Sequence, residues 1–100
     1  MFAILDDEHN VIPADINEWS AWLKDDDEKR RVAVTTVGAI TISTIFLGTD
    51  HGFGSVPQWF ESMVFGEKDV EDERQWRYET WDQAVAGHKA LCALTLGITE

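Results

Sequence analysis

The stretch VAVTTVGAITISTIFL, residues 32–47, decides the fold. β-Branched residues dominate it on both sides of Gly38, and such residues favour extended strands. A glycine at this point supplies the positive φ that a tight hairpin turn needs. We therefore predict two antiparallel strands, at residues 32–36 and 39–47. Alternate side chains of a strand share one face, and we expect the core beside Ile40, Ile42, Thr44 and Phe46.

Two helices are predicted outside this hairpin. Asp15 precedes Glu18 by three residues, and Thr80 precedes Gln83 by the same interval, which is the spacing of a capping box at a helix start. The first helix should begin near Asp15 and bury a stripe of Ile16, Trp19 and Leu23. The second should end near Gly97 and bury a stripe of Trp81, Ala84, Val85, His88, Leu91, Cys92 and Leu96.

Shorter apolar runs complete the predicted sheet. Strands are expected at residues 2–5, 59–65 and 74–79, each of which ends at polar residues or at a glycine. We therefore predict one α+β domain over residues 1–100. It has a small antiparallel sheet of about four or five strands, with two helices packed on one face.

The charge balance restricts the classes of partner. Nineteen acidic and eight basic residues give a net charge of −11, which opposes direct binding to nucleic acid because phosphate contacts require a basic surface. The sequence shows neither a secretory signal nor a membrane span. Cys92 is the single cysteine, so an intramolecular disulfide is excluded. A cytoplasmic protein without a cofactor is expected.

Two runs carry much of the acidic charge. They contain Asp25, Asp26, Asp27 and Glu28, and then Glu67, Asp69, Glu71, Asp72 and Glu73. Such runs can keep a protein soluble, or they can complement a basic groove on another protein. We predict a protein-binding surface there, and the solubilising role remains the simpler alternative.

The glycine-rich loop GTDHGFGS, residues 48–55, holds the residues that most resemble a catalytic or ligand site. Asp50, His51 and Phe53, with Trp59 and Glu61 after them, are predicted to line a small-ligand pocket. A less favoured alternative is a metal-dependent or acid–base enzyme at Asp50, His51, Glu61 and His88. Both hypotheses have a structural alternative. Asp50 can accept backbone hydrogen bonds in a turn, and His88, which lies on an apolar stripe, can be a hydrogen-bonded residue of the core. A phosphate ligand would need Arg74, Arg77 or Lys89 nearby.

Five tryptophans are many for one hundred residues. Trp19 and Trp81 belong to the predicted helix stripes, whereas Trp22, Trp59 and Trp76 have no evident place. Tryptophans of this kind can fill a small core, anchor a protein interface or stack on a base. The sequence leaves these alternatives open.

Three segments, TIFLGTDHGFG (44–54), PQWFESMVFG (57–66) and RYETWDQAVAGHKAL (77–91), resemble a group of small uncharacterised proteins of bacteriophages and prophages. The shared patterns are F-L-G-x-D-H, F-E-(S/T)-M-V-F-G and T-W-x-x-A-x-x-G-H, and the similarity covers roughly residues 30 to 92. It assigns no catalytic residue. The resemblance implies only where the protein acts, which is the cytoplasm of an infected bacterium.

In that context we expect a non-enzymatic phage protein that binds a host factor, as an inhibitor or adaptor in anti-defence or host takeover. The host factor could be a nucleic-acid-binding or defence protein, and a homodimer remains open. The alternative is a protein that sequesters a small ligand or a nucleotide. The claim of host interaction rests on analogy between proteins of similar sequence.

Overall fold

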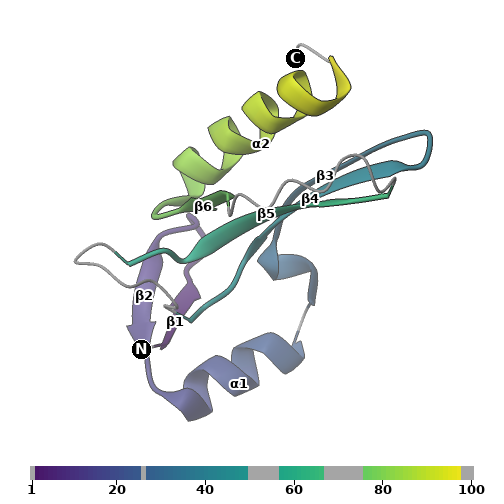
Figure 1. The fold of residues 1–100 in the computed structure, drawn as a ribbon. Helices are drawn as coiled ribbons and strands as arrows, with labels where there is room; N and C mark the ends of the chain where they lie inside the picture. The colour runs from purple at the N-terminus through teal and green to yellow at the C-terminus, as the bar shows by residue number, and fades with distance from the viewer. Residues whose placement is uncertain (1, 26, 50–56, 67–75, 98–100) are drawn as a thin grey trace.

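The computed structural model describes residues 2–25, 27–49, 57–66 and 76–97, and within them the chain has the predicted α+β fold (Figure 1). The elements follow one another as β1 (Phe2–Leu5), β2 (Val11–Ala14), α1 (Ile16–Asp25), the 3-10 helix η1 (Asp27–Arg30), β3 (Arg31–Val37), β4 (Ile40–Phe46), β5 (Phe60–Phe65), β6 (Trp76–Tyr78) and α2 (Trp81–Leu96).

The larger sheet is an antiparallel meander in the order β3-β4-β5-β6. The hairpin of β3 and β4 turns at Gly38, whose φ of 60° is the left-handed value expected there. Helix α2 lies along one face of this sheet and contacts all four strands (Figure 1). On that face β4 presents Ile42, Thr44 and Phe46, which are fully buried as predicted, whereas Ile40, predicted with them, is half-buried.

The smaller sheet is a hairpin of β1 and β2, against which α1 packs. Helix α1 therefore packs on the small sheet and α2 on the large one, whereas the sequence predicted both helices on one face of a single sheet. The backbone N–H of Ala3 donates to the carbonyl of Gly48 (2.8 Å), and this bond joins β1 to the end of β4. Sequence analysis missed β2 because it contains Pro13. Pro13 pairs with Ala3, whose N–H donates to Gly48 and so points away from β2. The backbone nitrogen of Pro13 likewise points away from β1, so the hydrogen bond that proline cannot donate is not one of the bonds of the hairpin.

Both predicted capping boxes are present. The Glu18 backbone N–H donates to Asp15 Oδ1 (2.8 Å), and Thr80 Oγ1 accepts from the Gln83 N–H (3.1 Å). Helix α2 ends at Gly97 in the left-handed conformation, also as predicted. The predicted stripe of α1 is wrong at one position, since Ile16 is 55% exposed. Helical periodicity fixes which residues share a face but not how far the neighbouring sheet extends.

Among the described residues, the buried side chains form two hydrophobic clusters. The first lies between the β1–β2 hairpin, the end of β4 and the start of α2. The second lies under the C-terminal half of α2. The buried members of the first are Ala3, Leu5, Phe46, Trp59, Phe60 and Ala84, with Trp22 and Trp81 packed against them. The second comprises Ile42, Leu91 and Cys92, with Val64 and Trp76 beside them.

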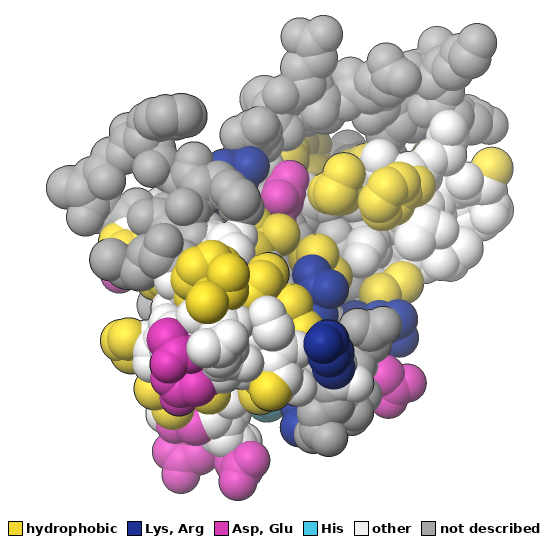
Figure 2. Space-filling view, turned by 90° about the horizontal axis from the view of Figure 1, so that it is seen from below, with side chains coloured by type: hydrophobic (Ala, Val, Ile, Leu, Met, Phe, Trp, Pro, Cys, Tyr) yellow, Lys and Arg dark blue, Asp and Glu magenta, His cyan; other side chains and the backbone are white. Residues whose placement is uncertain are grey.

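The opposite face of the large sheet carries exposed apolar side chains. Val34, Met63 and Phe65 are 46%, 45% and 50% exposed, and their strand positions alternate with those facing α2. Figure 2 views the molecule from the side opposite α2, where hydrophobic side chains gather near the middle with acidic and basic side chains around them.

Candidate binding pocket

A tight turn between β1 and β2 fixes the first part of the site. The Asp6 carboxylate accepts hydrogen bonds from the Glu8 N–H (2.9 Å), the Asn10 N–H (2.8 Å) and Asn10 Nδ2 (3.1 Å). The backbone and then the side-chain amide of Asn10 are the main causes that lower the pKa of Asp6 below its usual value. Within this turn His9 takes a φ of 66°, a left-handed conformation that histidine adopts more readily than most residues.

The start of α2 supplies the second part. Thr80 caps the helix, and this places Trp81 at the first helical position with Asp82 after it. The His9 and Trp81 rings stack with centroids 3.7 Å apart and planes 8° from parallel. Trp81 also meets the buried Phe60 ring edge to face. The stack therefore joins the turn to the helix and links both to the core.

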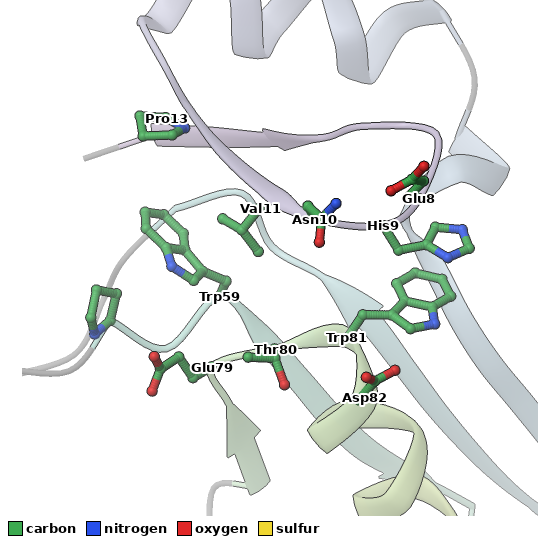
Figure 3. A pocket seen from close by; sticks show the side chains of 11 residues that line it. Glu8, His9, Asn10, Val11, Pro13, Trp59, Glu79, Thr80, Trp81 and Asp82 are labelled. Atoms are coloured by element: carbon green, nitrogen blue, oxygen red, sulfur yellow. The ribbon is translucent and has the colours of Figure 1, made fainter.

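Between these parts lies a pocket of about 640 Å³ (Figure 3). Its size is within the range of about 300–1,000 Å³ typical of ligand sites. The lining residues are Glu8, His9, Asn10, Val11, Pro13, Pro57, Trp59, Glu79, Thr80, Trp81 and Asp82. Figure 3 shows Trp59 and Glu79 apart from each other toward one end, and the His9–Trp81 stack with Glu8 and Asp82 at the other.

The pocket is electrostatically negative. Glu8, Glu79 and Asp82 are exposed carboxylates, and among the described lining residues none is Lys or Arg. The N-terminus of α2 opposes this with an effective charge of about +0.5. Three carboxylates outweigh that half charge, so a cationic group is favoured in the pocket over a phosphate.

A second polar group lies inside the fold. His88 is 3% exposed, and its Nε2 and Nδ1 contact Thr35 Oγ1 (2.9 Å) and Thr44 Oγ1 (2.7 Å). Thr44 Oγ1 also bonds Ser62 Oγ, which bonds the Tyr78 hydroxyl at 3.1 Å. Burial raises the pKa of Tyr78, and its bond to Ser62 partly offsets the rise. These residues form a polar layer between the two hydrophobic clusters.

The structure separates the described residues of the predicted ligand pocket. Trp59, 8% exposed, belongs to the first hydrophobic cluster and lines the pocket described above. Glu61 lies one position beyond the buried Phe60, on the opposite face of β5, where Arg77 Nε is 4.0 Å from its carboxylate. The other predicted residues, Asp50, His51 and Phe53, lie outside the described residues.

Glu61 and His88, the two described members of the predicted enzyme or metal site, lie on opposite faces of the sheet. Their side chains therefore cannot meet in one site. Among the residues that the structure describes, no group of three His, Cys, Asp or Glu side chains is arranged to hold a metal ion.

The two predicted acidic runs lie largely outside the described part of the chain. Glu28 is described and exposed. Asp26, Glu67, Asp69, Glu71, Asp72 and Glu73 lie outside it, as do the side chains of Asp25 and Asp27. Of the basic residues considered for phosphate, Arg77 faces Glu61, Lys89 is exposed on α2, and Arg74 lies outside the described residues.

Sequence reasoning missed most of the pocket. It treated residues 6–10 as a polar turn, placed Glu79 at the end of a strand at residues 74–79 and assigned no role to Asp82. The available signal was the pair of acidic, aromatic segments EHN (8–10) and ETWD (79–82). Nothing in the sequence places these segments side by side, because the contact depends on how the β1–β2 hairpin packs against α2.

Comparisons with known proteins assign no family to this chain, since no protein-family model, curated protein or solved structure matches it. Within the described residues, none of the helices has the length and apolar character needed to cross a membrane. The function is therefore inferred from the pocket and from the charge of the chain.

Proposed function

We propose that this protein is a non-enzymatic binding protein that recognises a basic surface of another protein. The observation that carries the proposal is the pocket at the junction of the β1–β2 turn and α2, which combines aromatic walls with three exposed carboxylates. Aromatic side chains provide contact area, and carboxylates provide attraction to a basic partner.

The charge of the whole chain supports the same conclusion. A net charge of −11 gives long-range attraction to a basic surface, which raises the rate of encounter. The exposed carboxylate of Glu8 lies on the turn that forms one side of the pocket. The attraction is therefore directed to a place where aromatic groups can then make contact.

The resemblance to phage-encoded proteins supports a host protein as the partner. A phage protein of this kind would act as an inhibitor or adaptor, for example by occupying the basic groove of a nucleic-acid-processing or defence factor. An acidic domain suits such a groove because it competes with the phosphates that the groove normally binds.

The proposal is tested by affinity capture from a bacterial host lysate, followed by binding kinetics with the purified partner. We expect a stoichiometric partner whose association slows as salt rises. The double variant Glu79→Gln/Asp82→Asn should lower the association rate severalfold, since steering depends on charge near the contact. Asp7→Asn removes a comparable charge on the same turn, outside the pocket lining, and should have a smaller effect.

A partner that binds all three proteins at the same rate would contradict the electrostatic proposal. Absence of any captured protein from lysates of several hosts would count against protein binding altogether.

The second candidate function is sequestration of a small ligand. The pocket volume of about 640 Å³ favours it, because a metabolite-sized molecule would fit. The carboxylates make a small cation a better ligand than a nucleotide, whose phosphates they repel. Native mass spectrometry of the purified protein separates the candidates: a reproducible bound mass that dissociates on unfolding favours the small ligand.

A further inference from the structure

We infer that the pocket receives one arginine side chain of the partner protein. The inference rests on the proposed function and specifies its central contact. Three properties of the pocket point to arginine: its concave shape, its aromatic and aliphatic walls, and its carboxylates.

The walls suit the long stem of the side chain. Val11, Pro13, Pro57 and Trp59 provide apolar surface, against which the methylene groups of arginine or lysine can pack while the charged end stays near water. The exposed His9 ring, which stacks on Trp81, adds a planar aromatic surface on which a cationic group can stack. A side chain with an apolar stem and a cationic end matches both features.

The carboxylates suit the charged end. Glu79 lines the pocket below Trp59, and Asp82 and Glu8 lie near the His9–Trp81 stack (Figure 3). Within the described residues these three carboxylates form no ion pair, so they are available to a ligand. A cation beside the His9–Trp81 stack can therefore contact an aromatic ring and a carboxylate.

Arginine fits better than lysine. Its guanidinium is planar, stacks on aromatic rings, loses its weak hydration easily and donates five hydrogen bonds, including paired bonds to a carboxylate. The His9 ring already shows that a planar nitrogen-containing group stacks on Trp81 at this site. The compact, strongly hydrated ammonium of lysine gains less from such a wall.

The test uses N-acetyl-arginine N-methylamide as the probe and follows the amide and indole N–H resonances of the ¹⁵N-labelled protein by NMR. The citrulline counterpart, which is neutral and nearly isosteric, is the matched control. We expect the arginine probe to shift the indole N–H signals of Trp59 and Trp81 and the amides of residues 8–11. The citrulline probe should bind at least about threefold more weakly.

Variants then locate the contact. Glu79→Gln/Asp82→Asn should weaken arginine binding by about threefold to tenfold, whereas Asp7→Asn should leave it nearly unchanged. These carboxylates are exposed and the replacements nearly isosteric, so the fold should persist, and the amide spectrum of each variant verifies this.

Equal binding of the citrulline and arginine probes would overturn the inference. So would shifts confined to the open sheet face near Val34, Met63 and Phe65. Such results leave the proposed function standing, because partner capture and its salt dependence are measured separately. Failure of capture together with specific arginine binding would instead indicate a small cation as the natural ligand, and would overturn protein binding.

Discussion

His88 is nearly fully buried, yet both of its ring nitrogens have hydroxyl partners. A neutral imidazole donates from one nitrogen and accepts at the other, and a hydroxyl group can do either, so both contacts are satisfied in either tautomer. The hydrogen-bonded core role, one of the two considered from the sequence, is the one that the structure supports. Periodicity could place His88 on the buried stripe of α2, but its partners on β3 and β4 could not be read from the sequence.

Thr44 is the centre of this polar layer, and its removal should be costly. Thr44→Val keeps the shape of the side chain but leaves His88 Nδ1 and Ser62 Oγ without this partner. We expect the free energy of unfolding to fall by about 1–3 kcal/mol, measured by urea denaturation. Thr36→Val is the control, because the Thr36–Thr41 hydroxyl pair is exposed to water. Equal losses in both variants would contradict a special role for the layer.

Asp6 should make the stability of the folded protein depend on pH. Its pKa is lowered in the folded state, so the ionised carboxylate stabilises the fold at pH values above its ordinary pKa of 3.8. That contribution is lost as the pH falls through the lower folded value. Asp6→Asn removes the titrating group. We expect the wild-type protein to have the higher melting temperature near neutral pH, and the difference to shrink below about pH 4.

A difference between wild type and Asp6→Asn that stays constant from neutral to strongly acidic pH would show that the carboxylate charge does not stabilise the turn. Circular dichroism melts over a pH series measure this directly, and the acidic end of the series decides the result.

Helix α2 approaches β6 most closely at Gly87. A Cβ added there would overlap the Tyr78 ring, which itself bonds Ser62. Gly87 therefore packs directly against an aromatic ring. The glycine lowers the helix propensity of α2, but it allows the helix to pack closely against the sheet.

Gly87→Ala should destabilise the protein despite the better helix propensity of alanine. The propensity gain is about 1 kcal/mol, whereas overpacking costs about 1–3 kcal/mol, so we expect a net loss of up to about 2 kcal/mol. In a Tyr78→Ala background the clash is absent, and the same substitution should stabilise by up to about 1 kcal/mol. Denaturant melts of the four proteins measure this. The same sign of effect in both backgrounds would contradict the packing explanation.

Elements with a local signal were predicted well. The hairpin of residues 32–47 has a glycine turn between β-branched strands, and each helix has a capping box at its start. The residues next to the turn and to each helix start are therefore enough to predict where these elements begin. β2 was missed because its signal is not local. Pro13 lowers the strand preference of Val11–Ala14, and the strand exists because β1, tied to Gly48, offers a partner.

Two sheets meet at one end of the molecule, and the pocket lies at their junction with α2 (Figures 1 and 3). Neither the β1–β2 turn nor the start of α2 forms a site alone. The sequence indicated an acidic chain with several uncommitted tryptophans, and from this it predicted an acidic binding surface in general terms. It could not bring His9 and Trp81 together, because that contact depends on packing between segments far apart in the chain.

The central claim is that a basic partner protein binds at this pocket. The most direct measurement is site-specific photo-crosslinking to the captured partner, with a photoreactive phenylalanine analogue introduced either at Glu79 or at Met63. Glu79 lines the pocket, and Met63 is on the open face of the large sheet. We predict crosslinks from Glu79 to a partner peptide that contains arginine, and few from Met63. Crosslinks from Met63 alone would contradict the account and place the interface on the open sheet face.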